Sequence, residues 1–173
     1  MTTVAVIAVV VFGAMIAEAI VAARHDRQLR AAGAAEPPGD VYRIMQVAYP
    51  ACFVAMLAEG AWRQAPADQL FAAGLVGFAA AKALKYWAIA TLGVRWTFRV
   101  LVPPGSARIR RGPYRWLAHP NYVAVAGELI GIGAAMHALF TGPVAAVGFC
   151  LLMARRVAVE EQALGGGVEW RAR

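Results

Sequence analysis

Cysteine and charge are both scarce in this sequence, and each shortage narrows the class of protein. The two cysteines, Cys52 and Cys150, lie inside apolar segments, so we predict neither a disulfide framework nor a metal site. Charged residues make up 16% of the 173 residues and hydrophobic residues 61%, whereas a soluble domain is usually about 45–50% apolar. The composition therefore predicts a single domain that folds in a bilayer rather than in water.

Five apolar runs account for the excess of hydrophobic residues. Runs of about 18 residues or more can cross a bilayer as helices. The first run has no basic segment before it and is longer than the core of a signal peptide, so we expect it to remain as a membrane helix. The predicted fold is an all-α polytopic membrane protein with about five transmembrane helices, at residues 3–23, 44–62, 70–92, 122–140 and 144–159. In this scheme residues 1–92 form three N-terminal helices, and residues 93–173 form a loop, a helical hairpin and a tail.

The charges that are present are mostly positive, with 17 Lys and Arg against 10 Asp and Glu. Most arginines cluster at the ends of apolar runs, which is typical of charges facing anionic headgroups, so we expect membrane lipids and no nucleic acid as partners. The arginine-rich segments are 24–43, 93–120 and the C-terminal segment. This pattern predicts an inner-membrane protein with its N-terminus outside and its C-terminus in the cytoplasm. Lys82 and Lys85 fall near the cytoplasmic end of their run, where we expect them to extend toward the headgroups.

The segment from Arg111 to Tyr122 holds the first group of candidate site residues. Gly112-Pro113 is typical of a turn, and Pro120 suits the first position of a helix, so His119 is predicted near its N-terminal cap. A helix N-terminus offers unpaired N–H groups that suit a carboxylate. Glu128 follows inside the helix, where a carboxylate is costly unless paired or hydrated, so it is a functional candidate.

The second group lies at the end of the last helix, at Arg156, Glu160 and Glu161. Arg156 and Glu160 are spaced i, i+4 and are predicted to pair. The predicted turn at 141–143 allows only an antiparallel hairpin, which would bring this end beside His119 and Tyr122. Four glycines are predicted to let the two hairpin helices approach closely: Gly127, Gly131 and Gly133 on one helix and Gly148 on the other.

Together these motifs resemble the isoprenylcysteine carboxyl methyltransferase family. The pattern G-P-Y-x5-H-P-N-Y, a short apolar hairpin and R-x4-E-E-x2-L carries the resemblance, which is densest from Gly93 to Leu164. In that family the last two helices enclose S-adenosylmethionine. The resemblance therefore implies this cofactor, with contacts at Tyr114, His119, Pro120, Tyr122, Glu160 and Glu161.

Two upstream features narrow the resemblance, and one position departs from it. Leu92-Gly93-x2-Trp96-Thr97 and the basic loop ending at Glu36 look like a small bacterial branch that O-methylates alkylpyrones or alkylresorcinols. The family usually has Arg before His-Pro, whereas this chain has Ala118. A contact made by that Arg would be absent, or supplied by Arg111 or Arg115.

The sequence thus predicts methyl transfer to an oxygen of a lipophilic acceptor that enters from the bilayer. A carboxylate acceptor needs no base, whereas a phenol or enol does, and His119 or Glu128 is the candidate catalytic base. One alternative is an NADPH-dependent enzyme like the membrane sterol reductases, which share His-Pro-Asn-Tyr; the Glu160–Glu161 pair favours the methyltransferase. A membrane scaffold without enzymatic activity is the other alternative, and the oligomeric state stays open.

Several of these residues also have purely structural interpretations. The alternative for His119 is an interfacial capping residue, and Trp116 is best explained by an aromatic belt at the membrane surface. Glu18 and Glu59 are expected to pair or to extend toward the interface. His137 is expected to be inert, because it lies at the far end of its helix.

Overall fold

The computed structural model describes residues 2–101 and 109–165, with side chains through residue 162. Three of the arginines that contribute to the predicted positive-charge pattern, Arg108, Arg171 and Arg173, lie outside the described residues. The described chain contains no strand and is built from five α-helices and two short 3-10 helices. These are α1 (Thr2–Ala31), α2 (Tyr42–Trp62), α3 (Gln69–Leu92), η1 (Gly93–Arg95), η2 (Gly112–Arg115), α4 (Pro120–Ala135) and α5 (Thr141–Gly165).

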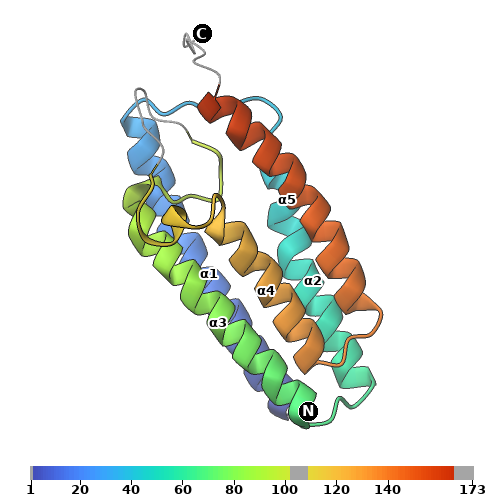
Figure 1. Ribbon diagram of the computed structural model, residues 1–173. Helices are drawn as coiled ribbons and strands as arrows, with labels where there is room; N and C mark the ends of the chain where they lie inside the picture. Colours follow the sequence, from blue (N-terminus) through green and yellow to red (C-terminus); the bar gives the residue numbers. More distant parts are fainter. Residues whose placement is uncertain (1, 102–108, 166–173) are drawn as a thin grey trace.

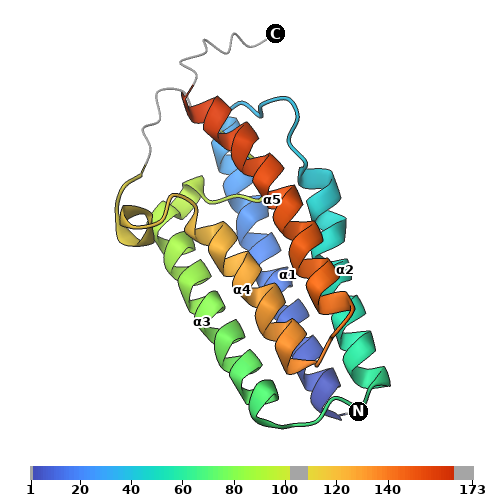
Figure 2. The same cartoon turned by 45° about the vertical axis from the view of Figure 1, so that its right-hand side comes forward.

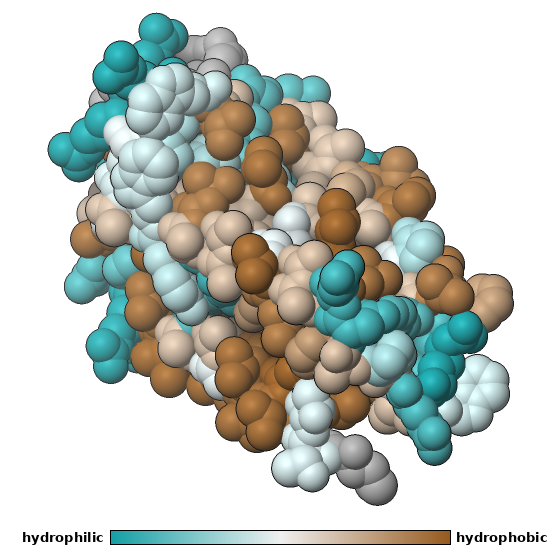
Figure 3. All heavy atoms as spheres, turned by 60° about the horizontal axis from the view of Figure 1, so that its bottom comes forward, coloured by the Kyte–Doolittle hydropathy of each residue, from teal (hydrophilic) through white to brown (hydrophobic). Residues whose placement is uncertain are grey.

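The prediction of an all-α polytopic membrane protein is confirmed. Four helices, α1, α2, α3 and α5, are long and apolar enough to cross a membrane, while α4 has only 16 residues. Figure 3 shows apolar residues covering much of the bundle's surface, with hydrophilic residues gathered toward its ends. Large apolar side chains such as Val9 and Val144 are each 73% exposed. A surface of this kind is stable only against lipid.

Successive helices run in opposite directions along the bundle (Figures 1 and 2). One end holds the N-terminus, the α2–α3 connection and the α4–α5 turn. The other end holds the α1–α2 loop, the segment between α3 and α4 and the end of α5. We call it the arginine-rich end, because the described parts of the arginine-rich segments, with Arg30, Arg99 and Arg156, lie there.

The turn between α4 and α5 falls earlier than predicted. The sequence placed it at 141–143, but residues 136–140 form the turn and α5 begins at Thr141. The physical reason is a cap from another helix: the Glu59 carboxylate accepts hydrogen bonds from the N–H groups of Phe140 and Thr141 at 3.2 and 2.8 Å. These bonds satisfy donors that a helix start leaves unpaired. Glu59 is therefore a structural residue.

The central helix is α4, and its glycines pack against α3 rather than mainly against α5. A Cβ atom added at Gly131 would lie 2.7 Å from the backbone nitrogen of Phe78, and one at Gly74 would lie 2.6 Å from the carbonyl oxygen of Gly131. A Cβ at Gly148 would meet nothing within 4 Å. The predicted contact of Gly148 with the α4 glycines is therefore wrong, although Gly133 does face Gly142 at the start of α5.

Candidate functional site

The turn that leads into α4 has the conformation that the sequence predicts. Gly112 has φ +56°, and a Cβ there would lie 2.3 Å from Oγ1 of Thr91, so only glycine fits. The turn continues as η2, and Pro120 is the first residue of α4 with His119 at the N-cap position. The side chain of His119 makes no capping hydrogen bond. Its ring is therefore available to other partners.

Those partners come from the end of α5. His119 Nε2 lies 2.8 Å from Oε1 of Glu161, and its Nδ1 lies 3.7 Å from Oε2 of Glu160. The Tyr122 hydroxyl donates to the same Glu160 oxygen at 2.9 Å, and its ring stacks on His119. The predicted convergence of the two motifs is confirmed by this geometry. We call these four residues the motif cluster.

Tyr114 lies beside this cluster on η2. Burial, together with the nearby negative charge of Glu160, raises the pKa of the Tyr114 phenol. The hydroxyl therefore stays protonated near neutral pH and can donate a hydrogen bond. All six positions that the family resemblance implies lie around the start of α4 and the end of α5. They are Tyr114, His119, Pro120, Tyr122, Glu160 and Glu161.

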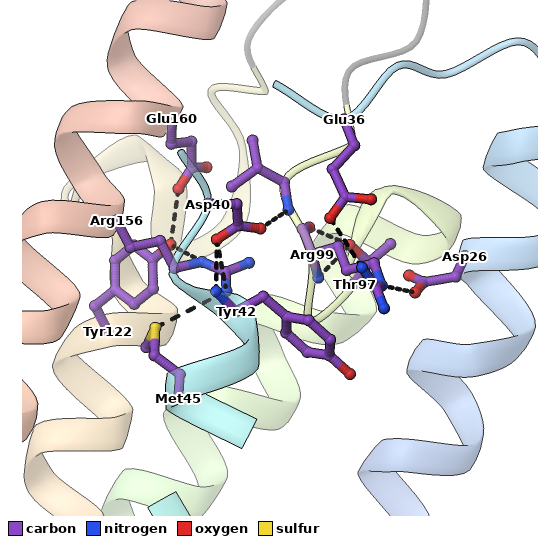
Figure 4. A network of polar contacts seen from close by, with 11 residues as sticks. Asp26, Glu36, Asp40, Tyr42, Met45, Thr97, Arg99, Tyr122, Arg156 and Glu160 are labelled. Atoms are coloured by element: carbon purple, nitrogen blue, oxygen red, sulfur yellow. Dashed lines mark hydrogen bonds and ion pairs between the residues drawn. The ribbon is translucent and has the colours of Figure 1, made fainter. Parts of the chain in front are cut away.

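Arg156 joins the motif cluster to the α1–α2 loop. Its Nε donates to the Tyr122 hydroxyl oxygen at 3.0 Å, and its Nη1 lies 3.6 Å from Oδ1 of Asp40 (Figure 4). The predicted ion pair between Arg156 and Glu160 is wrong: in the described chain, Arg156 pairs with Asp40. The side chain turns inward to the loop instead of running along the outside of α5, because position 156 faces the bundle interior.

A second ionic group holds the same loop to the segment after α3. Arg99 lies 2.9 Å from Oε1 of Glu36 and 3.5 Å from Oδ2 of Asp26 (Figure 4). Arg30 also pairs with Glu36, at 2.5 Å. Burial opposes ionisation of Glu36, but its hydrogen bonds to Arg30 and Arg99 prevail and lower its pKa. The loop is thus fixed at two points, through Glu36 and through Asp40.

Trp96 connects the upstream motif to the His-Pro-Asn-Tyr motif. It is 2% exposed. Its indole Nε1 donates to Oδ1 of Asn121 at 3.3 Å, and its carbonyl oxygen lies 2.8 Å from His25 Nδ1. Trp96 therefore orients the first turn of α4 relative to α1.

A cavity of about 570 Å³ adjoins the motif cluster. Its wall is mostly apolar. Tyr122 and Arg156, which make the polar contacts described above, also line this cavity. Ligand pockets commonly span about 300–1,000 Å³ and combine an apolar wall with a few polar groups. The apolar lining comes from four helices and includes Met15, Met45, Val125, Phe149 and Met153.

A buried group of four charges lies deeper in the bundle. Lys82 Nζ lies 2.7 Å from Glu18 and 2.9 Å from Glu128, and Lys85 Nζ lies 2.7 and 3.2 Å from the same two carboxylates. The Tyr49 hydroxyl also donates to Glu128 at 2.5 Å. We call the four charged residues the ion quartet. It balances two positive with two negative charges and joins α1, α3 and α4.

The quartet corrects the prediction for the two lysines. Lys82 and Lys85 are only 8% and 2% exposed, so they do not extend toward the headgroups. Carboxylates on α1 and α4 reach them inside the bundle, which compensates the cost of burial. For Glu18 the sequence left pairing and extension toward the interface open, and in the structure it pairs.

Glu128 and His119, the two candidate bases, thus have different surroundings. Glu128 is 1% exposed and belongs to the quartet. Of the quartet, Glu18 and Lys85 are among the described residues that line the cavity, and Glu128 is not. His119 lies in the motif cluster, next to Tyr122 on the cavity wall. A catalytic role for Glu128 stays a prediction.

The position where the family usually has Arg is exposed here, at Ala118. Arg115 and Arg111, the two residues expected to replace that arginine, have contacts outside the motif cluster. The Arg115 guanidinium lies over the Trp116 ring, and Arg111 lies 3.5 Å from the carbonyl oxygen of Thr91. A guanidinium does reach the cluster, from Arg156 on α5.

Sequence reasoning missed two residues of this region, Asp40 and Tyr49. Asp40 stands two residues before α2 and accepts from the Tyr42 N–H at 3.1 Å, which is a common role for Asp at a helix start. That position was a usable signal. Tyr49 lies in the middle of an apolar helix, and nothing in the sequence indicates that it faces Glu128.

Comparison with known proteins agrees with this geometry. The sequence model of the isoprenylcysteine carboxyl methyltransferase family matches residues 72–165, which is 94 of the 173 residues and includes the whole motif cluster. The chain is therefore a membrane methyltransferase by class. It belongs to the isoprenylcysteine carboxyl methyltransferase family, whose members generally use S-adenosylmethionine.

Two curated bacterial relatives match most of the chain. The uncharacterized protein YpbQ of Bacillus subtilis is 26% identical over 148 residues, covering 86% of this chain and 88% of the relative. An uncharacterized protein of Haemophilus influenzae is 26% identical over 142 residues, covering 82% of this chain and 83% of the relative. No solved structure matches the chain. The relatives agree with a small bacterial branch of the family.

Proposed function

We propose that the protein transfers a methyl group from S-adenosylmethionine to an oxygen of a lipophilic acceptor. The observation that carries the proposal is the position of Tyr122 and Arg156. Both side chains line the apolar cavity, and both belong to the polar contacts that include Glu160. A charged cofactor and an apolar acceptor could therefore meet at this boundary.

The residues of the motif cluster fit the cofactor chemically. The partial positive charge at the start of α4 suits a carboxylate, and the carboxylates of Glu160 and Glu161 suit an ammonium group or ribose hydroxyls. The side chains of Glu160 and Glu161 are 31% and 43% exposed, so a water-soluble molecule can reach them. Tyr114 adds a hydrogen-bond donor. The cofactor would supply an electrophilic methyl group on its sulfonium.

The cavity suits the acceptor. Its mostly apolar wall would hold a lipid chain, and the polar groups of Tyr122 and Arg156 in its lining would hold the oxygen that is methylated. The chain's contribution to the rate would be to hold this oxygen in line with the methyl group. An alkylresorcinol, an alkylpyrone or a prenylcysteine carboxylate has this form.

A hydroxyl acceptor must lose its proton, and we propose that His119 receives it. Its ring is held by Glu161 at 2.8 Å and stacks on Tyr122 at the cavity wall. A histidine oriented by a carboxylate is a common general base. The Glu161 carboxylate would then stabilise the imidazolium until the proton passes to water.

The orientation in the membrane follows from the same site. We infer that the arginine-rich end faces the cytoplasm across a bacterial inner membrane, because arginines concentrate on the cytoplasmic side of membrane proteins. The N-terminus then lies outside. This places the motif cluster on the side where the cofactor is made.

The test is binding and methyl transfer with the purified full-length protein in lipid nanodiscs. We expect S-adenosylhomocysteine, the demethylated product, to bind in calorimetry, and we expect label from methyl-labelled S-adenosylmethionine to enter lipids of a membrane extract. His119→Ala should abolish labelling, whereas His137→Ala, in the α4–α5 turn at the other end of the bundle, should not. Wild-type labelling by His119→Ala would exclude the assigned role. Binding of NADPH without S-adenosylhomocysteine would favour a reductase instead.

A further inference from the structure

The α1–α2 loop places a buried carboxylate beside the motif cluster. The side chain of Asp40 is 4% exposed. Its Oδ1 accepts from the Tyr42 N–H at 3.1 Å and lies 3.6 Å from Arg156, and its Oδ2 accepts from the Val100 N–H at 3.1 Å. Figure 4 shows this carboxylate between the α5 side chains and the segment that follows α3. Asp40 therefore links three separate parts of the chain.

Arg156 has two acidic residues within its reach. Its side chain is 7% exposed, and a guanidinium that is this deeply buried needs a carboxylate partner. Glu160 lies one turn further along α5, at the spacing at which opposite charges on a helix attract. In the structure Arg156 instead pairs with Asp40. The two carboxylates therefore compete for one guanidinium.

The choice of partner decides how Tyr122 and Glu160 interact. The Tyr122 hydroxyl has a single proton, and Arg156 Nε donates to its oxygen at 3.0 Å. The proton is therefore directed to Glu160, whose Oε2 accepts it at 2.9 Å. A guanidinium that moved to Glu160 would break this bond and occupy the carboxylate.

We propose that Asp40 is a positioning residue of the cofactor site. Its charge holds Arg156 against Tyr122 and away from Glu160, so that Glu160 stays available to the cofactor. Asp40 itself touches neither the cofactor nor the acceptor. The inference rests on the proposed function, because it concerns the cofactor contact of Glu160.

The experiment measures the Kd of S-adenosylhomocysteine by calorimetry with full-length variants in nanodiscs. Asp40→Asn keeps a side-chain oxygen for the Tyr42 N–H but removes the charge, and we expect it to raise Kd at least about tenfold, which is about 1.4 kcal/mol. The matched control is Glu36→Gln, which removes another paired carboxylate of the same loop. It should leave Kd within about twofold of wild type.

A double variant separates positioning from general destabilisation. In a Glu160→Gln background the competing carboxylate is absent, so Asp40→Asn should cause no further rise in Kd. Arg156→Lys provides a second variant, since its ammonium lacks the Nε donor that contacts Tyr122 and should also raise Kd. A lower unfolding midpoint for Asp40→Asn with an unchanged Kd would overturn the inference. So would additive losses in the double variant.

The two proposals fail in different ways. A wild-type protein that does not bind S-adenosylhomocysteine would overturn the proposed cofactor and the positioning role with it. Wild-type binding with the same Kd in Asp40→Asn would overturn only the positioning role.

Discussion

Removing one charge from the ion quartet should destabilise the protein strongly. Glu128 lies 2.9 and 3.2 Å from the ammonium groups of Lys82 and Lys85. At an effective dielectric constant of about 20, each attraction amounts to about 5–6 kcal/mol. Repulsion from Glu18 and the cost of burying Glu128 offset part of this. For Glu128→Gln we therefore expect a net loss of about 3–5 kcal/mol, as for other broken buried ion pairs.

The control restores the balance of charge. Lys82→Met alone should cost a similar amount, because it leaves an excess negative charge. The double variant Glu128→Gln/Lys82→Met retains one lysine and one glutamate, so it should recover most of the loss. The free energy of unfolding can be measured by SDS titration in mixed micelles with tryptophan fluorescence. A double variant as unstable as the sum of its single variants would refute the view that charge balance stabilises the quartet.

The remaining predictions concern packing, capping and pH. Gly131→Ala should lower the unfolding free energy by about 1–3 kcal/mol, because α3 must move away from α4, while Gly148→Ala should change it little; equal effects would contradict the packing. Glu59→Ala should cost about 1–2 kcal/mol in the same assay by uncapping α5, and an unchanged stability would argue against the cap. Because its pKa is lowered, ionised Glu36 stabilises the fold above its unfolded-state pKa, and this contribution is lost as the pH falls through the folded-state pKa. Glu36→Gln should therefore flatten the acid side of a stability–pH curve, and an unchanged curve would contradict the assignment.

The helices were predictable because their signals are local. Long apolar runs identify α1, α2, α3 and α5, and Pro120 marks the start of α4. The α4–α5 turn was misplaced because Gly142-Pro143 is a usual turn signal. The cap from Glu59 is 81 residues away in sequence from Phe140, so no local pattern could reveal that α5 begins before that proline.

The candidate site was predictable in part for the same reason. His119, Tyr122 and Glu160 stand in two short motifs on helices joined by a tight turn, so their convergence followed from chain connectivity. The quartet did not, since Glu18 and Glu128 meet the lysines from helices whose relative rotation the sequence leaves open. The spacing of Lys82 and Lys85 at i, i+3 on an apolar helix indicates a shared polar face, but it does not identify the partners.

The shortness of α4 has a consequence for a lipid substrate. Sixteen residues, at about 1.5 Å per residue, span about 24 Å, whereas the hydrocarbon layer is about 30 Å thick. If the far ends of the helices reach the opposite surface, His119 lies several ångströms below the headgroups. Each methylene drawn from lipid into water costs about 0.8 kcal/mol. A reaction centre at this depth lets a long-chain acceptor react without leaving the membrane. The chain length of the acceptor should therefore affect turnover less than in an enzyme that must transfer its substrate into water.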